Sequence, residues 1–364
     1  MKKVLLLGGT GAIGKALINQ LLLDDQIELF VTSRQSLQPS SRITYLKGNA
    51  HDADFLHGVL AEHYDAIIDF MYYNHVEEFE RRISMLLAST RQYIFISSSR
   101  VYANSDSPIT EQSVRLLDSV SDGAYLSSSD YALTKAREED VLLKQDLKNW
   151  TIVRPYITFG ENRFQLGCME KEGWLYRALE GRSIVFSQDI YNKYTAMTSG
   201  DEVASAIATL LNKIEAMGQM FQIASGKSIR WSDVLAIYLQ VIEKIKGFRP
   251  KVVCTKKDLY LSIPHTKWQV CYDRIYDRYF SSDKIEKLLG YPLGRNMQTE
   301  LIEVLGKFVQ CPSFKPIDWG LEALRDKEAK EHTPLSEIPN NKLRIVYLIY
   351  RYLPLWFARA IFNH

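Results

Sequence analysis

The first 25 residues carry the pattern that most constrains the fold: an apolar run, three spaced glycines and a helical stretch. The apolar run from Val4 to Leu7 predicts a strand that is buried on both faces of a parallel sheet. Gly8, Gly11 and Gly14 follow it at GxxGxxG spacing. Such glycines serve a tight turn, a close backbone approach to a pyrophosphate, and close packing of helix on strand, with the phosphates at the helix N-terminus. We therefore predict a dinucleotide-binding segment, the alternative being a plain glycine-rich turn.

The end of the next apolar stretch, IELFVTSRQ, bears on which dinucleotide fits. An NAD-selective site would usually have an acidic residue there to bind the ribose hydroxyls. Ser33 and Arg34 occupy that place instead. Because a guanidinium pairs with a phosphate through two parallel hydrogen bonds, we expect NADP or NAD, with NADP slightly favoured. The alternative is that Arg34 is a solvated loop residue or stacks on the adenine.

Further along the chain, strand-like and helix-like stretches alternate. This alternation predicts an α/β fold of the Rossmann type, with a doubly wound parallel sheet and a smaller C-terminal substrate lobe. The four further strands are expected within ITYLKGN, YDAIIDFM, RQYIFISSSRVYA and WTIVRPYITFG.

We expect three parts along the chain, because 364 residues are enough for about two domains and an extension. The dinucleotide-binding domain is expected over residues 1–155 and about 196–225. The substrate lobe is expected over 156–195 and 226–310, and residues 311–364 would form a C-terminal extension with an apolar, basic helix.

Side chains suited to proton transfer fall where this sheet would hold a ligand. In an open α/β sheet the ligand lies at the carboxyl ends of the strands, and the fifth strand brings Ser97, Ser98 and Ser99 to that edge. Tyr131 and Lys135 stand four apart in a helical stretch, so they are neighbours on one face. A free tyrosine has a pKa of about 10, so a nearby lysine could help it to act as a base, while a serine hydroxyl could orient the substrate oxygen. Alone, such a pair is more often packing or a solvated charge.

Four motifs in one order resemble the extended short-chain dehydrogenase/reductases of the NAD-dependent epimerase/dehydratase family: GGTGAIG, ISSSRVY, YALTK and VRPYITFG. The similarity runs from residue 1 to about 310. It implies that Tyr131 is the general acid/base, that Lys135 is its partner and holds the cofactor ribose, and that Ser98 completes the catalytic set. It also implies that Asn49 faces the adenine and that Pro155 lines the binding site of the nicotinamide. The cofactor-binding residues expected in all are Gly8, Thr10, Gly11, Ala12, Ile13, Gly14, Ser33, Arg34, Asn49, Phe70, Ser97, Tyr131, Lys135, Pro155 and Ile157.

The resemblance implies an NAD(P)-dependent epimerase or oxidoreductase acting on a nucleoside-diphosphate sugar. Ser98, Ser99 and Arg163 are candidate substrate contacts. The family's sugar-nucleotide 4,6-dehydratases have an Asp-Glu pair where this chain has Ser99 and Arg100, and an arginine cannot serve as acid or base, so dehydration is not expected. The run DFMYYNH also replaces the family's small, histidine-bearing run. The alternative is therefore a catalytically silent NAD(P)-binding protein, a regulatory or RNA-associated scaffold.

Composition and charge bear on partners and compartment. A net charge of +2 with no basic stripe predicts no nucleic-acid partner. The four cysteines contain no CxxC pair and the seven histidines show no ligand spacing, so we expect neither a disulfide framework nor a metal site. These features predict a cytoplasmic protein, and they leave a homodimer open.

The stretch LRIVYLIYRYLPLWFARAIF, residues 343–362, is apolar and aromatic but broken by Arg351 and Pro354. A helix that spans a membrane needs about 20 apolar residues with few charges. Basic residues beside Tyr352 and Trp356 suit a helix at a membrane surface, so peripheral membrane contact through 343–362 is one hypothesis. The favoured alternative is a helix packed on the body of the protein or on a second subunit.

Overall fold

The computed structural model describes residues 1–264 and 266–362, and its residues cluster into two compact units. The first unit comprises Met1–Gly160, Ala196–Ser228 and Arg278–Met297, and the second comprises Glu161–Thr195, Ile229–Asp277 and Gln298–His364.

This division differs from the expected one in two places. Residues Arg278–Met297, expected in the substrate lobe, belong to the first unit because Ile285 and Leu293 are buried in its core. The residues after 310, expected as a separate extension, belong to the second unit.

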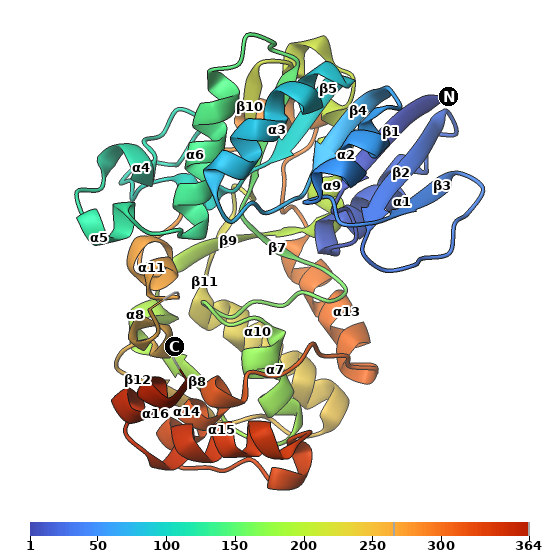
Figure 1. Ribbon diagram of the computed structural model, residues 1–364. Coiled ribbons are helices and arrows are strands. Elements are labelled where there is room, and N and C mark those ends of the chain that lie inside the picture. The colour runs from blue at the N-terminus through green and yellow to red at the C-terminus, as the bar shows by residue number, and fades with distance from the viewer. Residues whose placement is uncertain (265, 363–364) are drawn as a thin grey trace. The chain divides into compact units, whose positions relative to one another are not determined.

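The first unit is built on a seven-stranded sheet in which every neighbouring pair is parallel (Figure 1). The strand order is β10-β6-β5-β4-β1-β2-β3. The chain adds β2 and β3 on one side of β1 and then β4, β5, β6 and β10 on the other, so the topological switch point lies between β1 and β4. A ligand of such a sheet binds in the crevice at this switch point, outside the carboxyl ends of the strands. The predicted α/β, doubly wound Rossmann-type fold is therefore confirmed. The strands are β1 (Lys2–Leu7), β2 (Ile27–Ser33), β3 (Ile43–Lys47), β4 (Tyr64–Asp69), β5 (Thr90–Ile96), β6 (Trp150–Pro155) and β10 (Gln219–Ile223).

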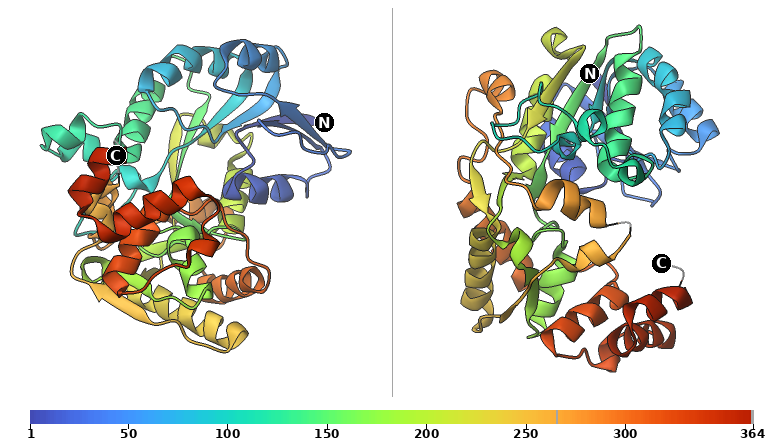
Figure 2. Two further views of the ribbon diagram at one scale, coloured as in Figure 1. Left: turned by 60° about the horizontal axis from the view of Figure 1, so that its bottom comes forward. Right: turned by 90° about the vertical axis from the view of Figure 1, so that its left-hand side faces the viewer.

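Both faces of this sheet are covered by helices, as the edge-on view in Figure 2 shows. Successive residues of a strand point to opposite faces, so Val4 and Leu6 of β1 enter one core while Leu5 and Leu7 enter the other. This explains why the first strand is a continuous apolar run. The first face packs on α1 (Ala12–Leu21), α9 (Gly200–Leu210) and α12 (Asp283–Leu289), and the second on α2 (Ala53–Leu60), α3 (Val76–Ala88) and α6 (Tyr131–Leu143).

The sixth expected strand is two strands in the structure. After β6 the chain turns at Tyr156, and β7 (Ile157–Phe159) pairs instead with β9 (Tyr194–Ser199) in a separate sheet. The short elements between the others are η1 (Ser99–Val101), α4 (Leu116–Ser119), α5 (Gly123–Leu126), η2 (Ile214–Ala216) and β11 (Ser228–Arg230).

The second unit is mainly helical, with one pair of parallel strands, β8 and β12. Its helices pack through aromatic side chains: the rings of Trp174 and Tyr238 stack with their centroids 4.4 Å apart. Its elements are α7 (Lys171–Leu179), β8 (Ile184–Ser187), α8 (Gln188–Tyr191), α10 (Trp231–Lys246), β12 (Val252–Thr255), η3 (Leu259–Ser262), α11 (Lys267–Gln269), η4 (Val270–Arg274), α13 (Met297–Gln310), α14 (Trp319–Ala329), η5 (Leu335–Glu337), α15 (Asn341–Tyr352) and α16 (Leu355–Phe362).

The apolar C-terminal stretch, expected as one helix, forms the two helices α15 and α16. Leu353 between them is extended, because the residue before Pro354 is disfavoured in the helical region. In the part of the chain that the structure describes, no helix combines the length and apolar character needed to cross a membrane.

Candidate active site

The turn from β1 into α1 has the geometry that the glycine pattern predicts. Gly8 has a φ of +69°, which L side chains rarely adopt, and its amide donates to Oγ1 of Thr32 over 2.9 Å. A Cβ on Gly14 would lie 2.2 Å from the carbonyl oxygen of Gly9, so helix and turn touch there. A Cβ on Gly11 would meet nothing within 4 Å, and no side chain caps this helix N-terminus. The turn therefore leaves open space and free amides, which suits a pyrophosphate.

The other residues expected to bind a cofactor lie along the carboxyl edge of the same sheet. Arg34 is exposed directly after β2, whose last residue, Ser33, is buried, and Asn49 is exposed two residues after the end of β3. Phe70 follows β4, and its amide donates to the carbonyl oxygen of Leu7. The remaining expected residues are Thr10 in the glycine turn, Ala12 and Ile13 in the first turn of α1, and Pro155 and Ile157, which are buried at the end of β6 and the start of β7.

The three serines after β5 differ in what their hydroxyls bond. Ser97 donates to Oε1 of Glu139 over 2.6 Å, and Ser99 donates to the carbonyl oxygen of Arg154 over 2.8 Å. The oxygen of Ser98 accepts from the amide of Arg100 over 3.2 Å. For the Ser98 proton, no acceptor is found among the described residues. Of the three, Ser98 therefore keeps a donor that a bound oxygen could use.

Tyr131 and Lys135 lie on one helix, as their spacing predicts. Tyr131 is the first residue of α6 and directly follows the N-cap residue Asp130, whose carboxylate accepts a hydrogen bond from the amide of Ala132. Lys135 is 2% exposed, and its ammonium donates to the carbonyl oxygen of Met71 over 3.1 Å. The segment η1, which begins directly after Ser98, packs against α6. The structure thus brings the serine strand end and the Tyr-Lys helix together in the first unit.

Charge surrounds the Lys135 ammonium. It lies 3.0 Å from Oε2 of Glu138 and 4.4 Å from the ring centroid of Phe95. Burial by itself lowers the pKa of Lys135, but its electrostatic interactions, with Glu138 first, outweigh this effect, and the pKa is raised. The ammonium therefore stays protonated at neutral pH although it is buried.

A buried carboxylate cluster under the site was not foreseen from the sequence. Asp69, the last residue of β4, is fully buried and accepts from the hydroxyls of Tyr73 over 2.9 Å and of Tyr93 over 2.6 Å. Burial raises the pKa of Asp69, and burial likewise raises the pKa of Glu138 to about 7. The unusual DFMYYNH run was the available signal, because it contains both Asp69 and Tyr73.

Two side chains beside Tyr131 were also missed. The ring of Tyr72 stacks on the ring of Tyr131 with centroids 5.6 Å apart. The guanidinium of Arg100 lies 5.5 Å from the Tyr131 ring centroid and 3.5 Å from the Asp130 carboxylate. Arg100, which stands where the family's dehydratases have an acid, therefore contributes a positive charge next to the phenol ring.

Arg163, the third candidate substrate contact, belongs to the second unit. Its guanidinium lies 3.3 Å from Oε1 of Glu170. The structure does not place Arg163 relative to the serines of the first unit, so its role stays a prediction.

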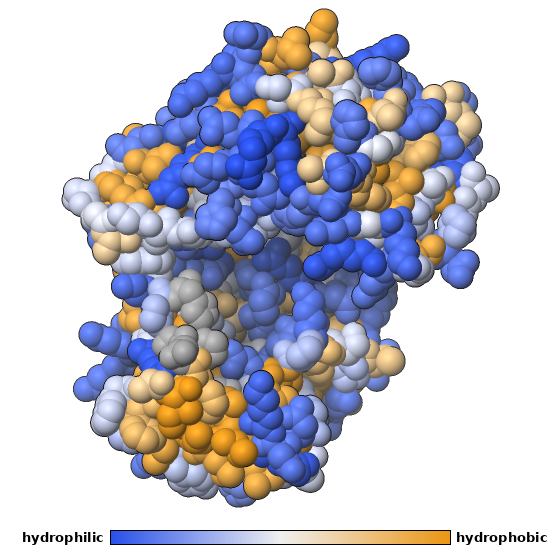
Figure 3. All heavy atoms as spheres, viewed as in Figure 1, coloured by the Kyte–Doolittle hydropathy of each residue, from blue (hydrophilic) through white to orange (hydrophobic). Residues whose placement is uncertain are grey.

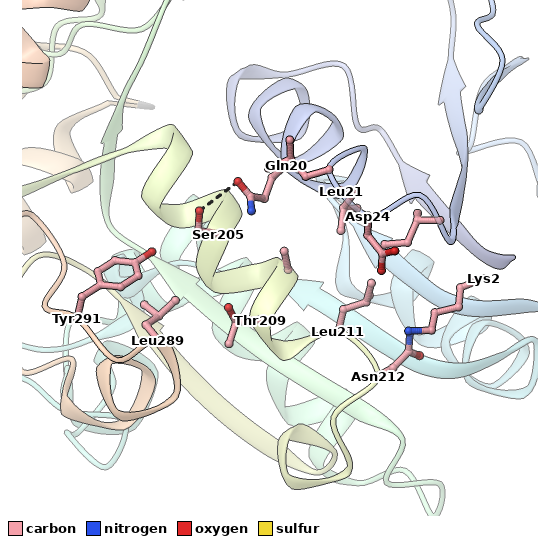
Figure 4. Close-up of a pocket in the computed structure, with 13 residues that line it drawn as sticks. Lys2, Gln20, Leu21, Asp24, Ser205, Thr209, Leu211, Asn212, Leu289 and Tyr291 are labelled. Carbon is pink, nitrogen blue, oxygen red and sulfur yellow. Dashed lines mark hydrogen bonds between the residues drawn. The ribbon is translucent and has the colours of Figure 1, made fainter.

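A pocket of about 530 Å³ in the first unit lies away from these residues (Figure 4). It opens between α1 and α9, where Ser205 donates to Gln20 over 3.3 Å, and it reaches Lys2 at the amino end of β1. Because ligands of such sheets bind at the opposite, carboxyl ends of the strands, this pocket is not the candidate site.

The parallel sheet, its glycine turn and its strand-end side chains together define a dinucleotide-binding α/β protein. The sequence profile described as the NAD dependent epimerase/dehydratase family matches residues 4–224. The chain belongs to this family. No curated protein matches its sequence.

Solved structures with the same fold are distant in sequence. An epimerase from the thermophilic methanogen Methanothermobacter thermautotrophicus is 18% identical, with a TM-score of 0.67 over 85% of this chain and 92% of the other. A dTDP-glucose 4,6-dehydratase from Bacillus anthracis in complex with NAD is 14% identical, with a TM-score of 0.66 over 85% and 97%. A UDP-glucuronic acid 4-epimerase from Bacillus cereus, in complex with UDP-glucuronic acid and NAD, is 17% identical, with a TM-score of 0.65 over 85% and 99%. These likenesses extend the fold assignment to most of the chain.

Proposed function

We propose that this protein is an NAD(P)-dependent epimerase or oxidoreductase whose substrate is a nucleoside-diphosphate sugar, with Ser98, Tyr131 and Lys135 as its catalytic residues. The observation that carries the proposal is the placement of a buried, protonated Lys135 one helical turn from Tyr131, beside the strand end that bears Ser98. Membership of the family supports the reaction class, and the substrates named in the related structures support the substrate class.

In this proposal the chain's own residues move a proton and hold the reacting groups. Tyr131 takes the proton of a sugar hydroxyl and returns it in the reverse step. The free Ser98 hydroxyl donates a hydrogen bond to the same sugar oxygen and so fixes its position. Lys135 supplies positive charge near Tyr131 and a donor for ribose hydroxyls. A nicotinamide dinucleotide, when bound, supplies acceptance and return of a hydride.

The glycine turn and the open space at Gly11 fit such a cofactor, with its pyrophosphate at the N-terminus of α1. Arg34, which is exposed directly after β2, supports the proposal that NADP is favoured. The related structures named above contain NAD, so measuring the affinity for both reduced cofactors in the wild type and in Arg34→Ala decides this point. Loss of affinity confined to NADPH is expected. An equal effect on both cofactors would contradict the preference.

The proposal excludes 4,6-dehydration, because Ser99 and Arg100 offer no acid or base at the positions where elimination of water needs one. Ser99 is moreover bonded to the carbonyl oxygen of Arg154. The likeness to a 4,6-dehydratase is a likeness of fold at 14% identity, so it does not bear on this exclusion.

The experiment combines substrate turnover with the variant Tyr131→Phe. Purified protein is incubated with UDP- and dTDP-sugars and either cofactor, and products are followed by absorbance at the nicotinamide band and by chromatography. We expect Tyr131→Phe to lower kcat by about 10²- to 10⁴-fold while cofactor affinity stays within about twofold, since only the proton-transferring hydroxyl is removed.

The matched control is Tyr291→Phe, which removes an exposed hydroxyl at the pocket between α1 and α9. It should turn over substrate like the wild type. Full activity in Tyr131→Phe would show that another group moves the proton. Cofactor binding with no turnover of any sugar nucleotide would favour the silent binding protein instead, and the stacking of Tyr72 on Tyr131 is the feature that fits that alternative.

A further inference from the structure

The helices α15 and α16 present an apolar outer face. Of the nineteen large apolar side chains exposed among the described residues, seven lie between residues 335 and 361. Figure 3 shows apolar side chains gathered over these helices. The seven exposed side chains are Leu335 of η5 and, on α15 and α16, Ile345, Leu348, Tyr352, Trp356, Phe357 and Ile361. Trp356 is the most exposed of the seven, at 72%.

The inner faces of the same helices are already used. Tyr347, Tyr350 and Ala358 are buried against α14, and the hydroxyl of Tyr347 donates to Oδ2 of Asp326 over 2.6 Å. On α15, Ile345, Leu348 and Tyr352 are spaced by three and four residues, so they form a separate outward stripe. The exposed side chains therefore cannot be buried by a simple rotation of either helix, since that would expose the packed ones.

From residue 338 to 362 this segment carries only positive charge, and Glu337, directly before it, is paired with Arg182. It contains Lys342, Arg344, Arg351 and Arg359 and no acidic residue. Among the described residues, no carboxylate forms an ion pair with any of these four. Arg344 donates to the backbone carbonyl oxygens of Leu335 and Ile338, and Arg351 donates to that of Glu331. Because these acceptors carry no net charge, the positive charges of the two guanidinium groups stay uncompensated.

We propose that the outer face of α15 and α16 docks on the surface of a lipid bilayer that contains anionic lipid. A helix that lies at such a surface buries its apolar side chains at the headgroup boundary while its basic residues meet the anionic headgroups. Trp356 and Tyr352 suit this boundary, because their rings are apolar and their polar tips stay hydrated. Neither helix is long enough to cross the bilayer, so the contact is peripheral. Uncompensated positive charge favours an anionic surface over a second copy of this face, whose charges would repel it.

The experiment is vesicle flotation of the full-length protein. One set of vesicles is phosphatidylcholine alone, and the other contains about 30% phosphatidylserine, a proportion that gives a strongly negative surface. We expect flotation with the anionic vesicles only, weakening as salt is raised. Ile345→Ser combined with Trp356→Ser should lower the vesicle affinity at least about tenfold, and Lys342→Glu should lower it for anionic vesicles.

The matched control is Leu23→Ser combined with Ile214→Ser, which removes two side chains of comparable exposure in the first unit. It should float like the wild type. Circular dichroism and thermal unfolding of every variant establish that the fold is kept, since all the substituted side chains are exposed. The tryptophan emission of the wild type should shift to the blue with anionic vesicles, and this shift should be lost in Trp356→Ser.

Two results would overturn the proposal. One is a wild type that does not float with anionic vesicles, or that floats equally with neutral ones. The other is a dimer in sedimentation analysis that Ile345→Ser with Trp356→Ser dissociates, which would show that a second copy covers the face. Neither result bears on turnover at Tyr131, so the membrane proposal and the enzymatic proposal fail separately.

Discussion

Lys135 shows how single residues in this site depend on their surroundings. An isolated ammonium buried in apolar protein would lose its proton readily, since burial disfavours the charged form. Here Glu138 lies 3.0 Å away and the carbonyl oxygen of Met71 accepts a hydrogen bond. The raised pKa of Lys135 keeps it charged. Burial raises the pKa of Glu138 to about 7, although the positive charge of Lys135 acts in the opposite direction.

Glu138→Gln tests this arrangement through the pH dependence of stability. The pKa of Glu138 is raised from 4.5 to about 7 in the folded chain. Between these two pH values Glu138 is therefore protonated in the folded chain and ionised in the unfolded chain. Its contribution to stability is therefore full below about pH 4.5 and is lost as the pH rises through about 7. We expect Glu138→Gln to match the wild type below about pH 4.5 and to exceed its free energy of unfolding by up to about 3 kcal/mol near pH 8.

Urea unfolding at a series of pH values measures this difference. The exposed control Glu80→Gln should stay within about 0.5 kcal/mol of the wild type throughout. A difference between Glu138→Gln and the wild type that is constant with pH, or that shrinks as the pH rises, would show that Glu138 is ionised in the folded chain at acidic pH.

At the scale of elements, the turn from β1 to α1 separates two roles of glycine. Gly14 serves the packing of the helix against the turn, since a Cβ there would lie 2.2 Å from the carbonyl oxygen of Gly9. Gly11 has open space beside it, so its lack of a side chain matters only to a bound molecule. The two positions are three residues apart in one motif, yet each requires glycine for a different physical reason.

This separation predicts opposite outcomes for two alanine variants. Gly14→Ala should lower the free energy of unfolding by about 1 to 3 kcal/mol, because a backbone atom must move to admit the Cβ. Gly11→Ala should leave stability within about 0.5 kcal/mol and weaken nicotinamide dinucleotide binding at least about tenfold. Thermal unfolding and cofactor titration measure the two effects. Equal cofactor affinity in Gly11→Ala and the wild type would argue against a pyrophosphate at this turn.

On the scale of the molecule, the C-terminal helices are part of the second unit. Arg177 on α7 is fully buried, and its guanidinium lies 2.7 Å from a carboxylate oxygen of Glu322 and 3.2 Å from carboxylate oxygens of Asp326 and Glu331. Removing the partners of a buried charge is strongly destabilising, typically by about 3 to 5 kcal/mol. The residues after 310 therefore supply the carboxylates that pair with the buried guanidinium of Arg177 in the second unit.

Two truncations test this role. A chain that ends at residue 318 lacks all three carboxylates, and we expect its second unit to be unfolded or aggregated and readily digested in limited proteolysis. A chain that ends at Pro354 loses only α16 and should keep a protease-resistant second unit, since α14 and its carboxylates remain. A soluble, protease-resistant product from the shorter chain would mean that the second unit folds without these helices.

How much of the structure could be predicted from the sequence depends on how far apart in the chain the interacting residues lie. The strand, glycine turn and helix of the first 25 residues follow from local pattern, and the fold class follows from the alternation of such elements. The break at Pro354 was local too, yet the stretch was expected as one helix. The inclusion of Arg278–Met297 in the first unit could not be predicted, because Ile285 and Leu293 reach its core only through the path of the chain.

The sequence by itself determined the spacing of Tyr131 and Lys135 and the glycine pattern, because each depends on residues within a few positions of one another. It also determined the sheet class, because the alternating strands and helices are each recognisable from local pattern. Only the tertiary structure decided which of the three serines keeps a free hydroxyl, since the bond of Ser97 to Glu139 joins residues 42 positions apart. It also decided that Asp69 is buried beneath the site with Tyr93 as its partner. Burial and long-range pairing are set by how distant segments pack, and no local pattern encodes that.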